Sequence, residues 1–359
     1  MIDDTDQQLS RQSKRIASVG MRCRQQRILS TLPYTKVNFW NRCVESYPLR
    51  KDLVAYILGL LRRAPKYDMI LLTGGERADL FYLAIAGLLP WIHTPHVVAD
   101  AHWQKAQGAA YVLQRAVFFL GRRLTAQVQP HSDEEVDIYH HIYGIPRSAL
   151  KAVPWSSTLI GHDVSNSRPD EEGNFMLTGG KSFRDYDVLF GAFKEFELRL
   201  EVGIPDSPDT RKLIEKWRAA SNVHFFTNWS NDQFIRKMAG CRAFLMPIAP
   251  GLTRSTADQS IVNAMYFGKI VIATNSISSR IYIRHGVNGF LVPEKSVEAW
   301  KHAIREVLSL PTDVLVLIGR RAAYDARVHF NENLRLVRTL EAALNVLQER
   351  GGIDAAPKS

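Results

Sequence analysis

Along most of the chain, short runs of apolar residues alternate with segments in which apolar residues recur every three or four positions. The first pattern is typical of buried strands, and the second of helices with one apolar face. In the first half, helices are predicted over residues 52–64, 79–89, 107–124 and from about 132 to 142. Strands are predicted over 66–75, 96–100, 125–129 and 151–155. Residues 1–40 show no clear period, although 15–21 is compatible with a strand.

A polar segment rich in Ser, Asn, Pro and Gly, residues 163–174, interrupts this alternation and is typical of an interdomain linker. The alternation then resumes, with strands expected over 175–180, 198–204, 222–227, 243–248 and 269–275 and a turn at 287–292. Helices are expected over 186–196, 210–220, 231–240, 258–267, 279–285, 296–308 and 311–348.

Alternating strands and helices predict an α/β fold with parallel, doubly wound sheets. A chain of 359 residues is long enough for two such domains. We predict an N-terminal Rossmann-like domain over 1–165, a C-terminal one over 173–330, and a closing helix over 331–350 that packs back toward the first domain. The two domains are expected to face one another across a cleft, with ligands at the carboxyl ends of the strands.

Composition narrows the class of protein. The chain is 46% hydrophobic and 23% charged, which is typical of a globular protein, and its three cysteines are too few and too far apart for a disulfide framework or a metal cluster. The longest apolar run, residues 80–92, contains a proline and is shorter than the ~20 residues that cross a bilayer. With a polar, acidic start, these features predict a cytoplasmic protein. The net charge of +10 favours an anionic partner.

The stretch ADQSIVNAMYFGKIVIATN, residues 257–275, indicates where an anion binds. Asp258 is expected to cap a short apolar helix, and Gln259 and Ser260 place neutral donors on its first turn. The first turn of a helix also carries backbone N–H groups without helical partners and the positive end of the dipole. We therefore predict an anion site at this helix, with a plain capped core helix as the alternative.

Five stretches then resemble, in order, the nucleotide-sugar domain of GT-B glycosyltransferases of the group 1 family, particularly bacterial enzymes of polysaccharide assembly. They are TGGKSFRDYDVLFGAF (178–193), NVHFFTNWSNDQFIRKMAGCRAFLMPI (222–248), the stretch over 257–275, RIYIRHGVNGFLVPEKSVEAWKHAI (280–304) and ARVHFNENLRLVRTLEAAL (326–344). The resemblance covers most of residues 175–345. It implies a UDP- or GDP-sugar as donor substrate, no other cofactor and no metal, and a glycan or polyprenyl-diphosphate-linked acceptor.

The resemblance also implies which residues hold the donor. Gly179 and Gly180 let the backbone approach the ligand, and Lys181 and Arg184 neutralise the leaving diphosphate. The donor-binding residues predicted in this way are Gly179, Gly180, Lys181, Arg184, Asn228, Ser255, Thr256, Gln259, Ser260 and Asn263. Many relatives have Glu at the positions of Ser255 and Asn263, so the two-carboxylate motif of the retaining enzymes is absent here.

An inverting transfer needs a base that removes a proton from the acceptor hydroxyl. Asp100 and His102 follow the apolar run HVVAD and are expected to be exposed toward the cleft, which makes them the first candidates. Glu76, after the Gly-Gly turn of the neighbouring strand, is the rival. A capping Asp and a structural His are the alternative interpretation. Ser132, beside His131, is expected to cap the helix that follows.

The helix over residues 109–124 combines apolar and aromatic side chains with three arginines. It is either a peripheral membrane contact at the inner face of the cell membrane or an ordinary core helix with a basic end. Two functions besides transfer remain open: a sugar-nucleotide epimerase on the same scaffold, and a non-catalytic partner of an active transferase. Nucleic acid is not expected as a partner, because no recognition motif with interleaved aromatic residues is present.

Overall fold

The computed structural model describes residues 2–32, 38–49, 51–159 and 173–350. The chain forms two compact units. Unit 1 comprises residues 1–155 together with the residues from Asn333 onward, and unit 2 comprises residues 156–332. The chain thus leaves unit 1 after Trp155 and returns to it after Glu332. The predicted linker over 163–174 lies outside the described residues except for its last two.

Unit 1 is built on a five-stranded parallel sheet with the order β2-β1-β3-β4-β5. The strands are β1 (Ile28–Ser30), β2 (Glu45–Ser46), β3 (Met69–Thr73), β4 (His96–Ala99) and β5 (Thr125–Val128). In this order the direction of winding changes between β1 and β3, which is where doubly wound sheets bind ligands. The prediction of a parallel sheet is confirmed.

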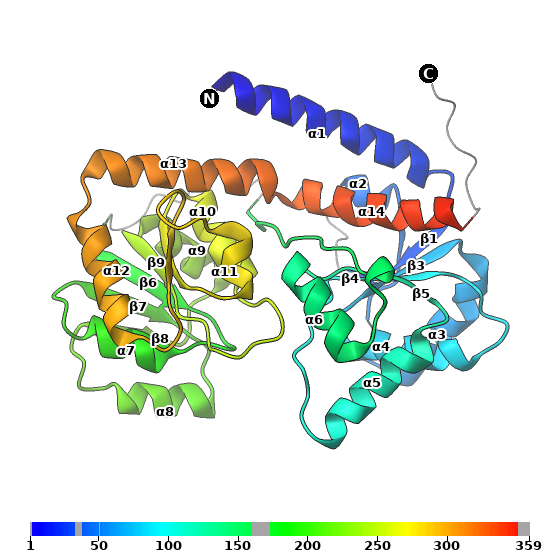
Figure 1. Cartoon of the computed structure of the whole chain (residues 1–359), viewed down its shortest axis with the longest axis horizontal. Helices are drawn as coiled ribbons and strands as arrows, with labels where there is room; N and C mark the ends of the chain where they lie inside the picture. The colour runs from blue at the N-terminus through cyan, green and yellow to red at the C-terminus, as the bar shows by residue number, and fades with distance from the viewer. Residues whose placement is uncertain (1, 33–37, 50, 160–172, 351–359) are drawn as a thin grey trace. The chain divides into compact units, whose positions relative to one another are not determined.

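Helices cover both faces of this sheet. The helical segments of unit 1 are α1 (Ile2–Cys23), α2 (Asn38–Asn41), α3 (Leu53–Arg63), η1 (Ala64–Lys66), α4 (Arg77–Leu88), α5 (Ala109–Gly121), α6 (Asp133–Tyr143), η2 (Arg147–Ala149) and α14 (Glu332–Glu349). On one face, α3, α4 and α6 supply Leu60, Tyr82 and Tyr139 to the core. On the other face, α1 and α14 lie side by side (Figure 1) and supply Val19 and Leu340.

The strand predicted over 151–155 is wrong, and residues 15–21, which are compatible with a strand, form part of a helix. Residues 15–21 belong to α1, where Val19 and Cys23 are buried at the four-residue spacing of a helix face. Residues 151–155 run beside the end of β5, and the N–H groups of Lys151 and Val153 donate to carbonyls there, but no ladder forms. Pro154 has no N–H group to continue one.

Unit 2 is a six-stranded parallel sheet with the order β11-β10-β9-β6-β7-β8. Its strands are β6 (Phe175–Gly179), β7 (Arg199–Gly203), β8 (Val223–Phe226), β9 (Ala243–Met246), β10 (Ile270–Thr274) and β11 (Phe290–Val292). This is the dinucleotide-binding order, and its winding direction reverses between β6 and β9. The predicted turn at 287–292 therefore ends in a sixth strand.

The helices of unit 2 agree in number and order with the prediction, except that the predicted helical tail begins here and ends in unit 1. They are α7 (Tyr186–Phe193), α8 (Pro208–Lys216), α9 (Asn231–Gly240), α10 (Asp258–Tyr266), α11 (Ile277–Tyr282), α12 (Val297–Ser309) and α13 (Thr312–His329). Phe190 of α7 and Ile304 of α12 pack with Leu245 of the sheet in the main core. These apolar faces hold the loops at the carboxyl ends of the strands in fixed positions.

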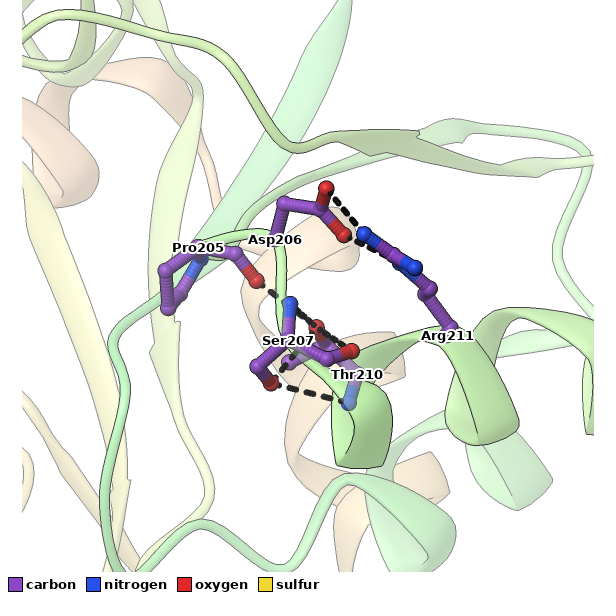
Figure 2. A network of polar contacts seen from close by, with 5 residues as sticks. All are labelled: Pro205, Asp206, Ser207, Thr210 and Arg211. Atoms are coloured by element: carbon purple, nitrogen blue, oxygen red, sulfur yellow. Dashed lines mark hydrogen bonds and ion pairs between the residues drawn. The ribbon is translucent and has the colours of Figure 1, made fainter.

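Most of these helices begin at a serine that satisfies their first turn. Figure 2 shows the start of α8, where Ser207 accepts from the N–H of Thr210 and the hydroxyl of Thr210 lies 2.9 Å from the Ser207 nitrogen. Asp206 and Arg211 form two hydrogen bonds of 2.7 Å beside this turn. The polar groups of this helix start therefore bind one another and leave little for a ligand.

Candidate active site

The loops that follow β6 and β9 are joined to each other at the point where the winding of the unit 2 sheet reverses. The N–H of Asp185 donates to Pro247 O over 3.0 Å, and that of Ala249 donates to Phe183 O over 2.9 Å. Arg184 thereby pairs with Ile248 in an isolated bridge. This short ribbon places the side chain of Arg184 at the carboxyl edge of the sheet, where doubly wound folds bind ligands.

Gly179 and Gly180 are needed for this geometry. A Cβ atom on Gly179 would lie 2.5 Å from the carbonyl oxygen of Gly203, and one on Gly180 would lie 2.7 Å from Nη2 of Arg184. Gly180 also has a φ of +117°, which other residues rarely adopt. The pair thus lets the guanidinium of Arg184 lie directly over the loop backbone.

Arg184 is a half-buried cation whose hydrogen bonds go to carbonyl groups. Its Nη1 donates to Ser182 O over 2.7 Å, and its Nε donates to Gly179 O over 3.4 Å. Among the described residues no carboxylate forms an ion pair with it. Burial lowers the pKa of Arg184, as does the charge of Arg254, whereas Tyr186 and the carboxylate of Asp258 act in the opposite direction. Lys181, three residues earlier, is exposed. The loop therefore presents a guanidinium that no ion pair engages among the described residues.

Helix α10 begins without a side-chain cap. Its N-cap is Ala257, in the left-handed region with a φ of 69°, and no side chain accepts from its first turn. The prediction that Asp258 caps this helix is wrong, because Asp258 is the first helical residue and its carboxylate accepts from the Tyr282 hydroxyl over 3.0 Å. Gln259 is exposed and Ser260 is half-buried on the same turn. An uncapped helix start with neighbouring neutral donors is suited to an anion.

Asn263 and Gln259 bind the segment by which the chain enters unit 2. The Oδ1 of Asn263 accepts from the Ser157 hydroxyl over 2.9 Å and from the Thr158 N–H over 3.1 Å. The Nδ2 of Asn263 donates to the Thr158 hydroxyl over 3.1 Å, and the Nε2 of Gln259 donates to the same hydroxyl over 3.2 Å. Asn263 is thus buried, and both the oxygen and the nitrogen of its amide are already hydrogen-bonded to the protein.

The remaining predicted donor residues are distributed around this edge. Ser255 is buried, and the N–H of Thr256 donates to the Ser278 hydroxyl. Asn228 follows β8 and is exposed. The structure thus brings Gly179, Gly180 and Arg184 together in one loop. It records no contact that ties Asn228 to them.

The expectation that Asp100 is exposed is wrong. Asp100 directly follows β4 and is 8% exposed, with a φ of 52°. Its carboxylate forms a buried ion pair with Arg335 of α14, whose guanidinium also lies 4.2 Å from the centre of the Trp155 ring. The partner is 235 residues later in the chain, so no local pattern indicates it. The one signal was an arginine within the apolar sequence LRLVRTL of the closing helix.

His102 and Glu76 lie at the same edge of the unit 1 sheet. His102 is half-buried, and its Nδ1 donates to Asp100 O over 2.6 Å. Its ring stacks against that of His131 with 5.9 Å between centres. Gly75 makes room for it, since a Cβ there would lie 2.7 Å from Cε1 of His102. Glu76 is the exposed N-cap residue of α4, and its side chain makes no capping bond.

Two further features complete the edge of unit 1. Ser132 accepts from the N–H of Glu135, so the prediction that it caps the next helix is confirmed. Asp79, which sequence reasoning missed, is fully buried and accepts from Thr31, from the Tyr56 hydroxyl and from the N–H of Thr73. Burial raises the pKa of Asp79 to about 6. Asp79 ties β1, β3, α3 and α4 together.

Within the described parts of the chain, no group of three His, Cys, Asp or Glu residues is arranged to hold a metal ion. In the same residues no helix has both the length and the apolar character that a membrane span requires.

Comparison with known proteins places these features in a family context. The family described as glycosyl transferases group 1 matches residues 202–324, about a third of the chain. No protein of curated function matches the sequence. Among solved structures, a glycosyltransferase from Rickettsia africae aligns with a TM-score of 0.66 at 15% identity, over 92% of this chain and 94% of that one.

Two further structures give the same fold. HepE from Anabaena, solved with UDP, aligns with a TM-score of 0.65 at 16% identity, over 93% of this chain and 96% of its own. Sucrose-phosphate synthase from Thermosynechococcus elongatus aligns with a TM-score of 0.61 at 14% identity, over 90% and 88% of the two chains. The resemblance to GT-B glycosyltransferases is thereby confirmed, with two Rossmann-like halves built on parallel sheets.

Proposed function

Since residues 202–324 match the group 1 glycosyl transferases and both halves have the GT-B fold, we propose that this protein moves a sugar from a nucleoside diphosphate to an acceptor hydroxyl. The acceptor we propose is a glycan or a lipid-linked glycan in polysaccharide assembly. The observation that carries the donor side is Arg184, which forms no ion pair within the described residues and donates to carbonyl groups.

The chemistry of the leaving group explains why such a cation matters. When the glycosidic bond breaks, a diphosphate with additional negative charge departs, and fixed donors aimed at that charge lower the barrier. Arg184, Lys181 and the uncapped start of α10 are suited to this role without a metal ion. The UDP and UDP-glucose complexes of HepE support a uridine nucleotide as the first donor to test.

Calorimetric titration of UDP, GDP and UDP-glucose tests the donor site. We expect one of the diphosphates to bind and Arg184→Gln to weaken it by about ten- to a hundredfold, the range for losing a charge-assisted hydrogen bond. Arg211→Gln is the matched control, because Arg211 is exposed in unit 2 and already paired with Asp206. Equal loss in both variants would indicate a general charge effect. Binding and transfer are expected to survive EDTA, and a strict Mg²⁺ requirement would contradict the metal-independent mechanism.

We assign the base to unit 1, with His102 before Glu76. Because Nδ1 of His102 donates to the Asp100 carbonyl, the neutral ring carries its lone pair on Nε2, which is the atom that accepts a proton. Asp100 is buried against Arg335 and is better placed to position this loop than to take the proton itself. Loss of general-base catalysis costs about 10²–10⁴ in rate. His102→Asn should lose this factor with UDP binding retained, and product NMR should show inversion.

The lipid-linked acceptor is supported by an exposed apolar surface on unit 1. Its members lie on the neighbouring helices α3, α4 and α5 and include Val54, Leu88 and Val112, all more than 60% exposed. Patches of this kind mark binding surfaces, and adjacent arginines such as Arg122 favour an anionic membrane. Co-sedimentation with vesicles containing anionic lipid, and its absence with neutral vesicles, tests this contact.

Two other functions remain as outcomes of the same assays. An epimerase would release an altered nucleotide sugar in the absence of any acceptor. A non-catalytic partner would bind the donor without hydrolysis or transfer. Transfer of the donor's sugar to a glycan hydroxyl distinguishes the proposed function from both.

A further inference from the structure

A cavity of about 620 Å³ lies beside α5 in unit 1. Its wall is formed by Leu83 of α4, Val98 and Val128 of the sheet, Phe118 of α5, and Trp103 and Tyr143. Pockets of this size hold small molecules. Every part of the wall belongs to unit 1.

The polar atoms of this wall are already bonded to the protein. Nε1 of Trp103 donates to Gly74 O over 2.6 Å, and the Tyr143 hydroxyl donates to Trp103 O over 3.2 Å. The hydroxyl of Thr125 donates to Gly121 O over 3.0 Å. A sugar or a nucleobase needs several unengaged partners to replace its hydrogen bonds with water, and apart from Arg115 and Arg122 the side chains of the wall do not provide them. The body of a ligand in this cavity is therefore apolar.

Positive charge lines the same cavity. The wall includes two cations, Arg115 and Arg122, and no acidic residue. Both side chains are exposed, and in the described part of the chain neither forms an ion pair with a carboxylate. The guanidinium of Arg122 stacks on the exposed ring of Phe119 at 3.9 Å from its centre, which keeps it beside the apolar surface. The head of the ligand is therefore anionic.

The helix over the cavity joins it to the exposed apolar surface. Of the residues of α5 only Gly121 is buried, and Val112 and Phe119, which line the cavity, are 68% and 58% exposed. A hydrocarbon chain in the cavity would thus be continuous with apolar groups outside it.

From these observations we propose that the cavity binds the hydrocarbon chain of a lipid phosphate, with the phosphate on Arg115 and Arg122. The ligand class is an aliphatic or isoprenoid chain with a phosphate head. This site rests on the proposed function only for its use in transfer, since binding itself involves none of the donor residues. It offers a place where a lipid-linked substrate is held by its chain.

Binding of 12-bromododecyl phosphate, below its micelle concentration, tests the site through quenching of tryptophan fluorescence by the bromine. We expect saturable quenching. The chain has seven tryptophans, of which Trp103 lines the cavity, so Trp103→Phe should remove most of the quenching. Ala116→Phe, which fills the cavity from α5, and Ala149→Phe, which fills it from η2, should each weaken binding by about tenfold or more. Ala110→Phe is the control, because Ala110 is exposed on α5 outside the cavity wall.

The charge is tested separately. Arg115→Gln with Arg122→Gln should weaken the phosphate by about tenfold or more and leave 12-bromododecanol unchanged. Quenching that the filled variants retain would overturn the proposal, since it would mean adsorption to the outside of α5. Competition by geranylgeranyl phosphate or by a short-chain phosphatidic acid identifies the chain type, and competition by neither overturns the site. UDP titration of each variant separates failure of this site from failure of the donor site.

Discussion

Two buried titratable groups of unit 1 should make its stability depend on pH in opposite directions. Replacing either one should reveal the pH dependence that the other causes. Asp79 is fully buried, and burial raises its pKa from 3.8 to about 6. His96 of β4 is also fully buried, and burial lowers its pKa from 6.5 to about 4. Its Nδ1 donates to Thr94 O and its Nε2 accepts from the Tyr82 hydroxyl, which fits the neutral ring.

The sign of each effect follows from which state binds more protons. Folded Asp79 keeps its proton up to about pH 6, whereas the unfolded carboxyl loses it near 3.8, so its contribution to stability falls as pH rises through this range. Folded His96 stays neutral down to about pH 4, whereas the unfolded ring is protonated below about pH 6.5. Its contribution to stability therefore falls as pH decreases through this range. Each pKa difference corresponds to about 3 kcal/mol. Over pH 4–6.5 the two slopes oppose one another and nearly cancel.

Asp79→Asn should therefore make unit 1 lose about 3 kcal/mol of stability between pH 6.5 and 4, and His96→Gln should make it gain about as much. The measurement is the free energy of opening from hydrogen exchange of peptides covering β3 and β4, corrected for the intrinsic rate at each pH. Peptides of β9 and β10 in unit 2 serve as internal controls. The double variant should restore a shallow slope. Equal slopes in the wild type and both single variants would refute the reasoning.

Three further substitutions test particular contacts. Arg335→Gln leaves the Asp100 carboxylate buried without its partner and should cost about 3–5 kcal/mol in unit 1, with partial recovery in the double variant Asp100→Asn/Arg335→Gln, both measured by urea unfolding. Gly180→Ala forces a Cβ to within 2.7 Å of the Arg184 guanidinium at a φ of +117°, so calorimetry should show weaker UDP binding while unrelated helices keep their exchange protection. Ser207→Ala removes the cap of α8 and should cost about 1 kcal/mol, visible as faster exchange in that helix and no change in UDP affinity.

Local patterns predicted most of the helices and strands of unit 2. A Gly-Gly pair after an apolar run, followed by cations, could be assigned to the carboxyl edge of a strand, and Gly179, Gly180 and Arg184 lie together there. The periodicity was also sufficient for the helices, since each is bounded by a capping serine or a break in the apolar pattern. The Asp258 cap was wrong because a left-handed Ala257 begins α10, and a backbone angle of that kind is not visible in a sequence.

Unit 1 was less predictable because its important contacts join distant parts of the chain. Asp100 was expected to be exposed, yet a residue of the closing helix covers it. Residues 15–21 were compatible with a strand because seven residues are too few to distinguish a strand from one stretch of a helix that continues for 22 residues. The same limit applied within unit 2 to the hydrogen bonds of Asn263 with Ser157 and Thr158, which precede it by about a hundred positions.

The charged side chains at the carboxyl edges of the two sheets differ in their hydrogen-bond and ion-pair partners. In unit 1, Asp79 accepts from three donors, Glu135 accepts from the Ser132 hydroxyl and from the N–H of His131, and Asp100 is paired with Arg335. In unit 2, Arg184 donates only to carbonyl groups. A carboxylate that already accepts several hydrogen bonds or an ion pair holds its charge for structural reasons, whereas a cation with neutral partners retains most of its attraction for an anion.

On the proposed function, this difference favours one placement of the two halves of a transfer reaction. We expect the donor diphosphate to bind unit 2, where Arg184 lies at the carboxyl edge of the sheet and forms no ion pair among the described residues. In unit 1 the buried acids Asp79, Asp100 and Glu135 are engaged, so we expect the base to be another group. We propose His102, because its bond to the Asp100 carbonyl fixes Nδ1 as the donor and makes Nε2 the basic atom. On this assignment we expect the ion pair of Asp100 to affect catalysis indirectly, because it holds the backbone that orients the His102 ring.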